Sequence, residues 1–147
     1  GFSLVATAKR NERRFVSIVM GVKSSRLRSK LTRMLLDEGF QKYKQVSLDV
    51  QLGMSPLSIE VDKGMESSLR LKTAHPLRVI LKENERMKIS HHFFLEDRII
   101  APVEEGQKLG DLEYRLGSVS LGKVPLIAEF GIEKAGFFAN FAKTLFN

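Results

Sequence analysis

The residues best suited to binding chemistry form a basic cluster near the start of the chain, made of Lys23, Arg26, Arg28 and Lys30. A guanidinium binds a carboxylate through two parallel hydrogen bonds, so a positioned arginine suits a carboxylate-bearing substrate. Most helix-surface arginines are instead solvated and unpaired, and on the residues alone that interpretation of Arg28 is favoured. Arg28 is therefore a candidate whose role depends on its surroundings.

Catalytic motifs are missing from the sequence. It contains no Gly-x-Ser-x-Gly elbow, phosphate-binding loop, dinucleotide fingerprint or His-Glu-x-x-His motif. Ser120 and Lys123 match the spacing of a Ser-x-x-Lys nucleophile motif, but Gly122 between them indicates a hairpin turn instead of the helix start at which that pair works. We predict no catalytic residue in this chain.

Metal and cofactor sites are not indicated either. His91 and His92 are consecutive, so on a strand they point to opposite faces and cannot ligate one metal together without distortion. The chain has no cysteine, which excludes disulfides, thiolate zinc sites and cysteine nucleophiles. Acidic neighbours such as Glu104 and Glu105 are typical of solvated turns. We expect no metal and no cofactor.

Positive charge is concentrated in the first 44 residues, where 11 Lys and Arg stand against three Asp and Glu, a net charge of +8, whereas the remaining residues carry −1. Such a segment attracts nucleic acid, anionic lipid or a carboxylate-bearing substrate through the same electrostatics. Nucleic acid is the least favoured, because no aromatic residues interleave the cluster. No apolar run is long enough to span a membrane, and no signal peptide is recognised.

The first 44 residues have the pattern of a strand, a turn, a strand and a helix. Residues 2–8 and 14–22 are rich in apolar and β-branched types around the polar turn at 9–13, which predicts an antiparallel hairpin. A helix should follow to about Lys44, capped by Ser24 or Ser25 and loosened or ended near Gly39. Its apolar positions repeat at helical spacing at Leu27, Leu31, Met34 and Leu35.

A hairpin with one helix buries little apolar surface, so this segment is expected to need more sheet. From residue 45 to 131 the apolar residues alternate with polar ones, and Gly and Pro recur at short intervals. Many short strands and a small β-sandwich domain are predicted. The alternating pairs and triplets are Val46/Leu48/Val50, Leu57/Ile59/Val61, Leu69/Leu71, Leu77/Val79/Leu81 and Met87/Ile89.

Residues 132–147 have the pattern of a short amphipathic helix. It is too short to span a bilayer, but it could lie at a membrane interface with its rings inserted, or pack on its own domain. On the residues alone, packing is the favoured interpretation. The apolar face comprises Phe137, Phe138, Phe141, Ala142, Leu145 and Phe146.

Several runs, in order along nearly the whole chain, resemble the low-molecular-mass penicillin-binding proteins, which are serine-type D-alanyl-D-alanine carboxypeptidases. Each run is weak alone, and Glu38-Gly39-Phe40 departs from the family's frequent Trp-Gly-Phe. The order and spacing are specific. The runs are Gly-Phe-Ser-Leu-Val-Ala-Thr-Ala at 1–8, residues 15–21, Leu-Leu-Asp-Glu-Gly-Phe at 35–40, Ile-Ala-Pro at 100–102, Gly-Gln-Lys-Leu-Gly at 106–110, Pro-Leu-Ile-Ala at 125–128 and Gly-Phe-Phe at 136–138.

The resemblance implies a division of the chain. Residues 1–44 would be the C-terminal portion of the transpeptidase-like catalytic domain, 45–131 the β-sandwich domain and 132–147 a membrane-anchor helix. The family's Lys-Thr-Gly motif stands just before the position matched by Gly1, and its other two catalytic motifs lie further upstream. All three are therefore expected outside this chain, which alone should be inactive.

The resemblance also implies partners. They are the N-terminal part of the same enzyme as a companion chain, the peptidoglycan stem peptide, β-lactam antibiotics and the periplasmic face of the bacterial cytoplasmic membrane, with no nucleic acid. Arg28 matches a basic family position beside the active site, which implies a role in holding the substrate's terminal carboxylate. The alternative that the residues leave open is a non-enzymatic β-module that binds membrane or peptidoglycan.

Overall fold

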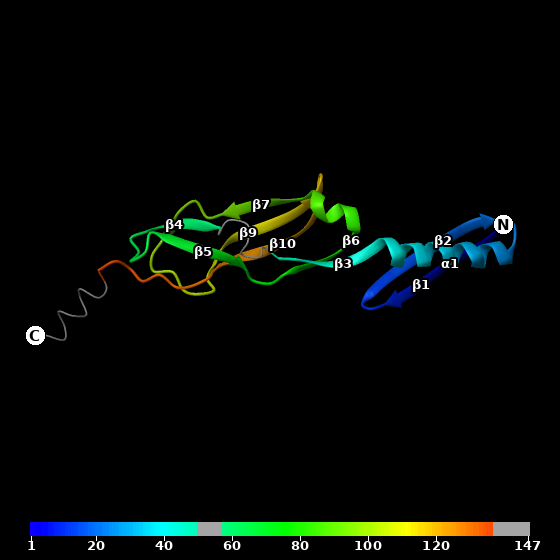
Figure 1. Cartoon of the computed structure of the whole chain (residues 1–147), viewed down its shortest axis with the longest axis horizontal. Coiled ribbons are helices and arrows are strands. Elements are labelled where there is room, and N and C mark those ends of the chain that lie inside the picture. The colour runs from blue at the N-terminus through cyan, green and yellow to red at the C-terminus, as the bar shows by residue number, and fades with distance from the viewer. Residues whose placement is uncertain (50–56, 137–147) are drawn as a thin grey trace, which may run out of the picture. The chain divides into compact units, whose positions relative to one another are not determined.

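The computed structural model describes residues 1–49 and 57–136, which form two compact units (Figure 1). The first unit combines Gly1–Val46 with Arg78–Met87, and the second combines Ser47–Leu77 with the described part of Lys88–Asn147. The segment 78–87, which the sequence pattern assigned to the β-rich part of the chain, thus joins the first unit.

The first unit begins with the predicted hairpin. Strand β1 (Phe2–Arg10) pairs antiparallel with β2 (Arg13–Val22), and the two residues between them adopt positive φ, 47° at Asn11 and 64° at Glu12. Turns of this kind match the right-handed twist of the flanking strands. Because side chains alternate across a strand, one face of the hairpin is covered by the helix and the other is exposed.

Helix α1 (Ser25–Lys42) packs on the hairpin and begins where expected, since the Leu27 N–H donates to the Ser24 hydroxyl at 3.2 Å. The helix ends at Lys42, close to the predicted end near Lys44, and it continues through Gly39 without a break. Leu27, Met34 and Leu35 of the apolar stripe are exposed, and the buried positions of the helix are Thr32 and Phe40.

The remainder of the first unit follows the predicted alternation only in part. Strand β3 (Tyr43–Leu48) continues directly from α1 and pairs with β6 (Leu77–Lys82), a two-stranded sheet. The 3₁₀ helix η1 (Glu83–Lys88) comes next. The prediction that Met87 alternates with Ile89 on a strand is wrong, because Met87 lies in η1 with 94% of its surface exposed.

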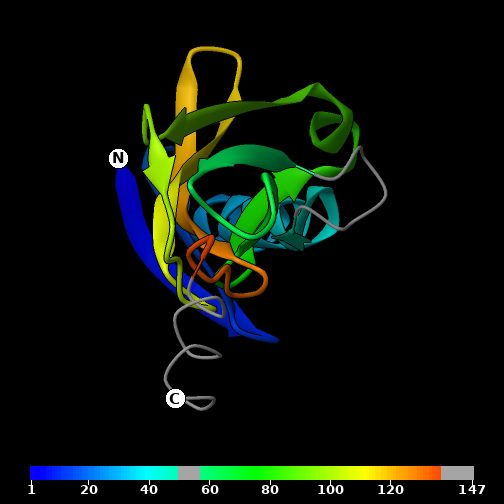
Figure 2. The same ribbon diagram turned by 90° about the vertical axis from the view of Figure 1, so that its left-hand side faces the viewer.

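The second unit is built on one six-stranded sheet in the order β7-β9-β10-β5-β4-β8. All adjacent pairs are antiparallel except β4 with β8. The sheet curls around its core, as the end-on view in Figure 2 shows. The predicted β-rich domain is confirmed, but it is a single curled sheet and not two separate facing sheets. The strands are β4 (Ser58–Asp62), β5 (Ser68–Thr73), β7 (Ile89–Leu95), β8 (Ile99–Ile100), β9 (Lys108–Leu116) and β10 (Val119–Ala128).

The core of this sheet is aliphatic, with one aromatic residue, Tyr114, in its centre. The fully buried side chains come from three neighbouring strands. Because side chains alternate across a strand, the apolar residues lie mainly on the inner face of the sheet and the polar residues mainly on the outer face. They are Leu69, Leu109, Leu112, Tyr114, Val124 and Leu126.

The predicted helix at residues 132–147 falls mostly outside the described residues, as do Val50 and the whole apolar face from Phe137 to Phe146. Its first residues are not helical. Ile132 is buried and forms an antiparallel bridge with Val103, and Lys134 bridges Gly64. The start of the predicted helix at Ile132 is therefore wrong, because backbone pairing in the second unit holds this stretch extended.

Candidate functional site

The basic end of α1 carries the one binding residue predicted from sequence. Arg28 is half-buried in the first turn; its backbone N–H donates to the Ser24 carbonyl at 3.0 Å and its guanidinium to the Ser25 hydroxyl at 3.0 Å. The first turn contains no acidic residue. The positive end of the helix dipole and the arginine therefore act together, and an anion is favoured at this position.

Three buried polar atoms lie where α1 meets β2 without a hydrogen-bond partner among the described residues. They are Arg28 Nε and Thr32 Oγ1 on the helix and Ser17 Oγ on the strand. Arg28 and Thr32 are four residues apart, so they lie on one face of α1. Because buried polar groups are normally paired, each of these three atoms leaves hydrogen-bonding capacity unmet on the packed elements α1 and β2.

The C-terminal end of α1 is held differently, by aromatic and cationic contacts. Phe40 is buried, and the guanidinium of Arg10 lies 4.5 Å from its ring centroid. Arg13 donates to the carbonyls of Phe40 and Tyr43, and Arg10 pairs with Asp37 at 3.0 Å. These arginines have structural partners, which leaves the cations at the other end of the helix as the candidates for binding.

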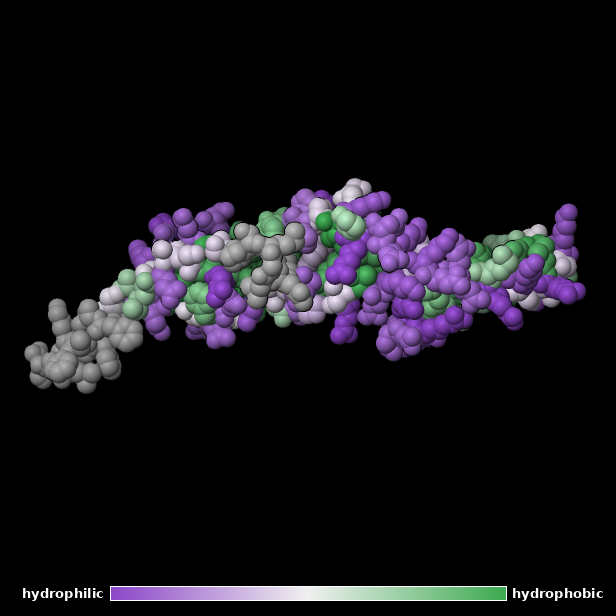
Figure 3. Space-filling view, in the orientation of Figure 1, coloured by the Kyte–Doolittle hydropathy of each residue, from purple (hydrophilic) through white to green (hydrophobic). Residues whose placement is uncertain are grey.

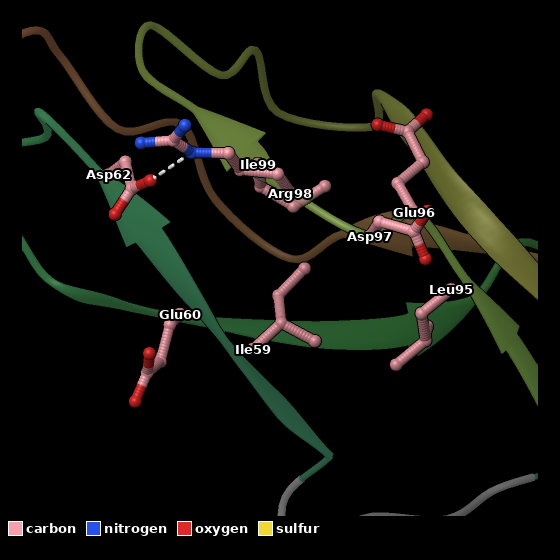
Figure 4. A pocket seen from close by; sticks show the side chains of 8 residues that line it. All are labelled: Ile59, Glu60, Asp62, Leu95, Glu96, Asp97, Arg98 and Ile99. Atoms are coloured by element: carbon pink, nitrogen blue, oxygen red, sulfur yellow. Dashed lines mark hydrogen bonds and ion pairs between the residues drawn. The ribbon is translucent and has the colours of Figure 1, made fainter.

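The second unit contains a shallow pocket of about 310 Å³, which the sequence patterns did not predict. Figure 4 shows the Arg98–Asp62 ion pair on one side and the carboxylates of Glu96 and Asp97 on the other, with Ile59 and Leu95 below them in this view. The lining contains carboxylates and one paired cation but no serine, histidine or lysine. This composition lacks the hydroxyl nucleophile with a histidine or lysine base that a serine-type enzyme uses.

Ser120 and Lys123 do not form a catalytic pair. The Ser120 hydroxyl donates to Glu113, and Lys123 Nζ lies 4.4 Å from the centroid of the Phe94 ring. The bond from Ser120 is the main reason that the pKa of Glu113 lies below its usual value, against the opposing effect of burial. The chance interpretation of this Ser-x-x-Lys spacing agrees with these contacts.

The two histidines lie apart, as expected for consecutive strand residues. His91 meets Tyr114 edge to face at 5.3 Å, whereas His92 Nε2 is 3.3 Å from the Ser90 hydroxyl. Among residues 1–49 and 57–136, no three His, Asp or Glu side chains are grouped as a metal would require. Over the same ranges, no helix is long and apolar enough to cross a membrane.

This chain is similar to known proteins over most of its length. A family model described as the penicillin-binding protein 5, C-terminal domain, matches residues 40–134. D-alanyl-D-alanine carboxypeptidase DacF of Bacillus subtilis is 27% identical over 145 residues, which cover 98% of this chain and 37% of the relative. DacC of Escherichia coli is 27% identical over 139 residues, 94% of this chain and 34% of the relative. The chain thus spans about a third of the length of these relatives.

Solved structures show the same fold at low identity. Penicillin-binding protein 5 from Haemophilus influenzae has a TM-score of 0.59 and 23% identity, over 91% of this chain and 39% of that one. The structure of PBP3 from Streptococcus pneumoniae has a TM-score of 0.60 and 18% identity, over 89% and 39% of the two chains.

The fold and the matched residues define the class as low-molecular-mass penicillin-binding proteins, which confirms the resemblance seen in the sequence. The chain belongs to the penicillin-binding protein 5 C-terminal domain family.

Proposed function

We propose that this chain is the C-terminal part of a serine-type D-alanyl-D-alanine carboxypeptidase. The complete enzyme removes the terminal D-alanine from peptidoglycan pentapeptides through a serine acyl-enzyme, and β-lactams acylate the same serine. In this proposal residues 1–44, which make up most of the first unit, are one wall of the catalytic domain, residues 45–131 are a spacer, and the serine chemistry comes from a companion part of the enzyme.

The observation that supports the proposal is the exposed apolar surface of the first unit. It lies on the outer face of the hairpin and on the outer side of α1. The outer face of the hairpin exposes Val5, Val16, Ile18 and Met20, the last with 74% of its surface accessible. The outer side of α1 exposes Leu27, Met34 and Leu35. Figure 3 shows hydrophobic residues at the surface of this unit.

Apolar faces of this extent usually mark an interface. The hairpin and α1 by themselves are the minimum of a layered domain, and a two-stranded ribbon is only marginally stable in water. The similarity to DacF extends over 98% of the chain and so includes this unit. A slice of a larger catalytic domain explains the hairpin, the helix and the two uncovered faces together.

Arg28 is proposed to hold the terminal carboxylate of the stem peptide, directly or through water. Its half-buried guanidinium has one side-chain partner, the Ser25 hydroxyl, and its Nε has none among the described residues. A fork-shaped cation with unmet donors, beside a helix N-terminus, is suited to a carboxylate.

A labelled penicillin tests the proposed function. Applied to the intact sample and resolved by denaturing electrophoresis, the label is expected on a companion chain or on the remainder of a longer polypeptide. Labelling of the isolated 147-residue chain would overturn the assignment of the nucleophile. A sample without any label would favour the non-enzymatic β-module that binds membrane or peptidoglycan.

We further propose that residues 137–147, the part of the predicted helix outside the described residues, anchor the enzyme at the periplasmic face of the cytoplasmic membrane. The support is the amphipathic pattern of the segment, with phenylalanines on one side and lysine on the other. Deletion of 137–147, which spares the bridged residue Ile132, should abolish cosedimentation with anionic liposomes. Unchanged cosedimentation would leave packing on the protein itself as the role of this segment.

A further inference from the structure

The two edges of the six-stranded sheet differ in how they are protected. The β8 edge has two residues, pairs in parallel with β4 and is followed by Pro102. The β7 edge has seven residues and pairs with β9 from Ile89 to Leu95 without a register shift. It contains no proline, bulge or charged residue, although native sheets commonly protect their edges with such features.

The backbone on the outer side of β7 can be identified from the hydrogen bonds on its inner side. The N–H of Glu96 donates to the Leu109 carbonyl, so Glu96 belongs to a hydrogen-bonded pair with β9. Antiparallel pairs alternate, so the even-numbered residues of β7 direct their backbone groups toward β9. The N–H and C=O groups of Ile89, His91, Phe93 and Leu95 therefore point to the open side.

The side chains of β7 are exposed on both faces of the sheet. The five central residues, Ser90 to Phe94, are all exposed, and the two phenylalanines keep 43% and 49% of their surface accessible. A long, aromatic edge that is paired without a bulge is a template for another strand. Strand addition satisfies its backbone, and the exposed rings supply the contacts between side chains.

We propose that β7 pairs antiparallel with β7 of a second copy of this chain, about a two-fold axis at His92. In this register His91 forms hydrogen-bonded pairs with Phe93 of the partner subunit, and Ile89 with Leu95 of the partner subunit. These are the residues whose backbone groups face outward, so the whole strand is used. His92 then lies opposite His92 of the partner subunit in a non-hydrogen-bonded pair.

The composition of β7 favours a second copy of this chain as the partner at this edge. β7 carries no Lys, Arg, Asp or Glu, so two copies of the strand can pair without bringing side chains of the same formal charge together. The carboxylate paired with His92 in the sheet, Glu113, belongs to β9, one strand further from the axis. A seven-residue edge buries less than the roughly 1,200–2,000 Å² typical of stable complexes, so the dimer should be weak and concentration-dependent.

Sedimentation velocity over a range of concentrations tests the dimer with the intact 147-residue chain. His92→Lys places two ammonium groups opposite each other at the axis and should raise the dimer dissociation constant at least about fivefold. The matched control is His75→Lys, the same exchange at an exposed loop residue, which should leave the constant unchanged. A chain that stays monomeric throughout, or equal dimerisation of both variants and the parent, would overturn the proposal.

A second variant locates the contact. The chain has no cysteine, so His92→Cys introduces a single thiol whose Cα lies about 4.5 Å from its copy in the proposed register, a separation that a disulfide accommodates. Mild oxidation should give a covalent dimer with His92→Cys and little with His75→Cys. Dimers joined through the apolar hairpin face would instead show no preference for position 92, and that result would exclude the β7 contact.

Discussion

The ring of Phe40 on α1 meets the ring of Phe15 on β2 edge to face, with centroids 4.8 Å apart and planes inclined by 85°. Phe40 retains only 5% exposure, and two arginines of the hairpin, Arg10 and Arg13, lie 4.5 and 5.6 Å from its ring centroid. This contact is the main link between the helix and the hairpin at the C-terminal end of α1.

Phe40→Ala should therefore destabilise the first unit by about 3 kcal/mol, because it removes a buried ring together with its aromatic and cation–π partners. Urea unfolding followed by far-ultraviolet circular dichroism reports the loss, since α1 is the only α-helix among the described residues. Met34→Ala, at a position with 54% exposure, is the control and should change the free energy of unfolding by less than about 0.5 kcal/mol. Equal effects of the two substitutions would mean that the Phe15–Phe40 contact does not hold the helix.

Gly110→Ala should open the pairing of β7 with β9. A Cβ at Gly110 would lie 2.4 Å from the Phe94 carbonyl oxygen, which belongs to the neighbouring backbone and cannot move aside alone. We expect a loss of roughly 1–3 kcal/mol and faster hydrogen exchange in β7.

Gly117→Ala is the comparison for that prediction. Gly117 has φ +60° and open space around its Cβ position, so the substitution costs only backbone strain, about 1 kcal/mol. It should leave hydrogen exchange in β7 unchanged. If both variants lost the hydrogen-exchange protection of β7 equally, the close backbone approach of Gly110 to Phe94 would not be the cause.

The stability of the second unit should depend on pH through Glu113. The hydroxyl of Ser120 lowers the pKa of this carboxyl, burial opposes the shift, and the charges of Arg115, Lys123 and His92 reinforce it. Because the pKa is lower in the folded protein, the carboxylate stabilises the fold above its unfolded pKa of about 4.3, and this contribution disappears as the pH falls through the folded value. Glu113→Gln should lower the free energy of unfolding at neutral pH. On acidification the variant should lose less of this free energy than the parent protein.

Ser120→Ala provides the direct test, since without the hydroxyl the pKa of Glu113 should rise toward its ordinary value in an NMR titration. Glu105→Gln, at an exposed turn, controls for the charge change and should leave the acid dependence of stability as it is. An unaltered Glu113 titration in the Ser120 variant would show that the hydrogen bond is not the cause.

The proposed role of Arg28 predicts that Arg28→Ala in the complete enzyme lowers kcat/KM for peptide substrates by about tenfold or more, because the substrate carboxylate would lose its cation. Arg26→Ala, an exposed neighbour in the same turn, should stay within about twofold of the parent. A substrate with a terminal amide separates binding from a structural role, since removal of Arg28 should affect it much less. Unchanged kcat/KM with the normal peptide would remove Arg28 from the site.

The sequence was informative where short-range patterns determine structure. The hairpin, the cap at Ser24 and strands β4, β5 and β6 follow from apolar alternation and from hydrogen-bonding residues at a helix start. It was less informative where tertiary contacts decide. The Phe15 ring packs directly against Gly39, so closely that a Cβ at Gly39 would lie 3.2 Å from a ring carbon, and helix propensity gives no sign of this contact.

The candidate site was less predictable. Arg28 could be chosen as a cation at a helix start, but its buried and unpaired Nε depends on the hairpin that packs across α1. Glu113 was not predicted as a residue of interest. It lies on β9 between the buried residues Leu112 and Tyr114 and faces the opposite side of the sheet, where its neighbours come from β7 and β10. Cross-strand pairs separated by many residues in the sequence leave no local signal.

The most direct measurement of the central claim is the release of D-alanine from a peptide that ends in D-alanyl-D-alanine. The polypeptide that unites this chain with the catalytic motifs should release D-alanine and lose that activity after treatment with penicillin, whereas the 147-residue chain alone should release none. Penicillin-sensitive release by the isolated chain, or no release by the united polypeptide, would contradict the account.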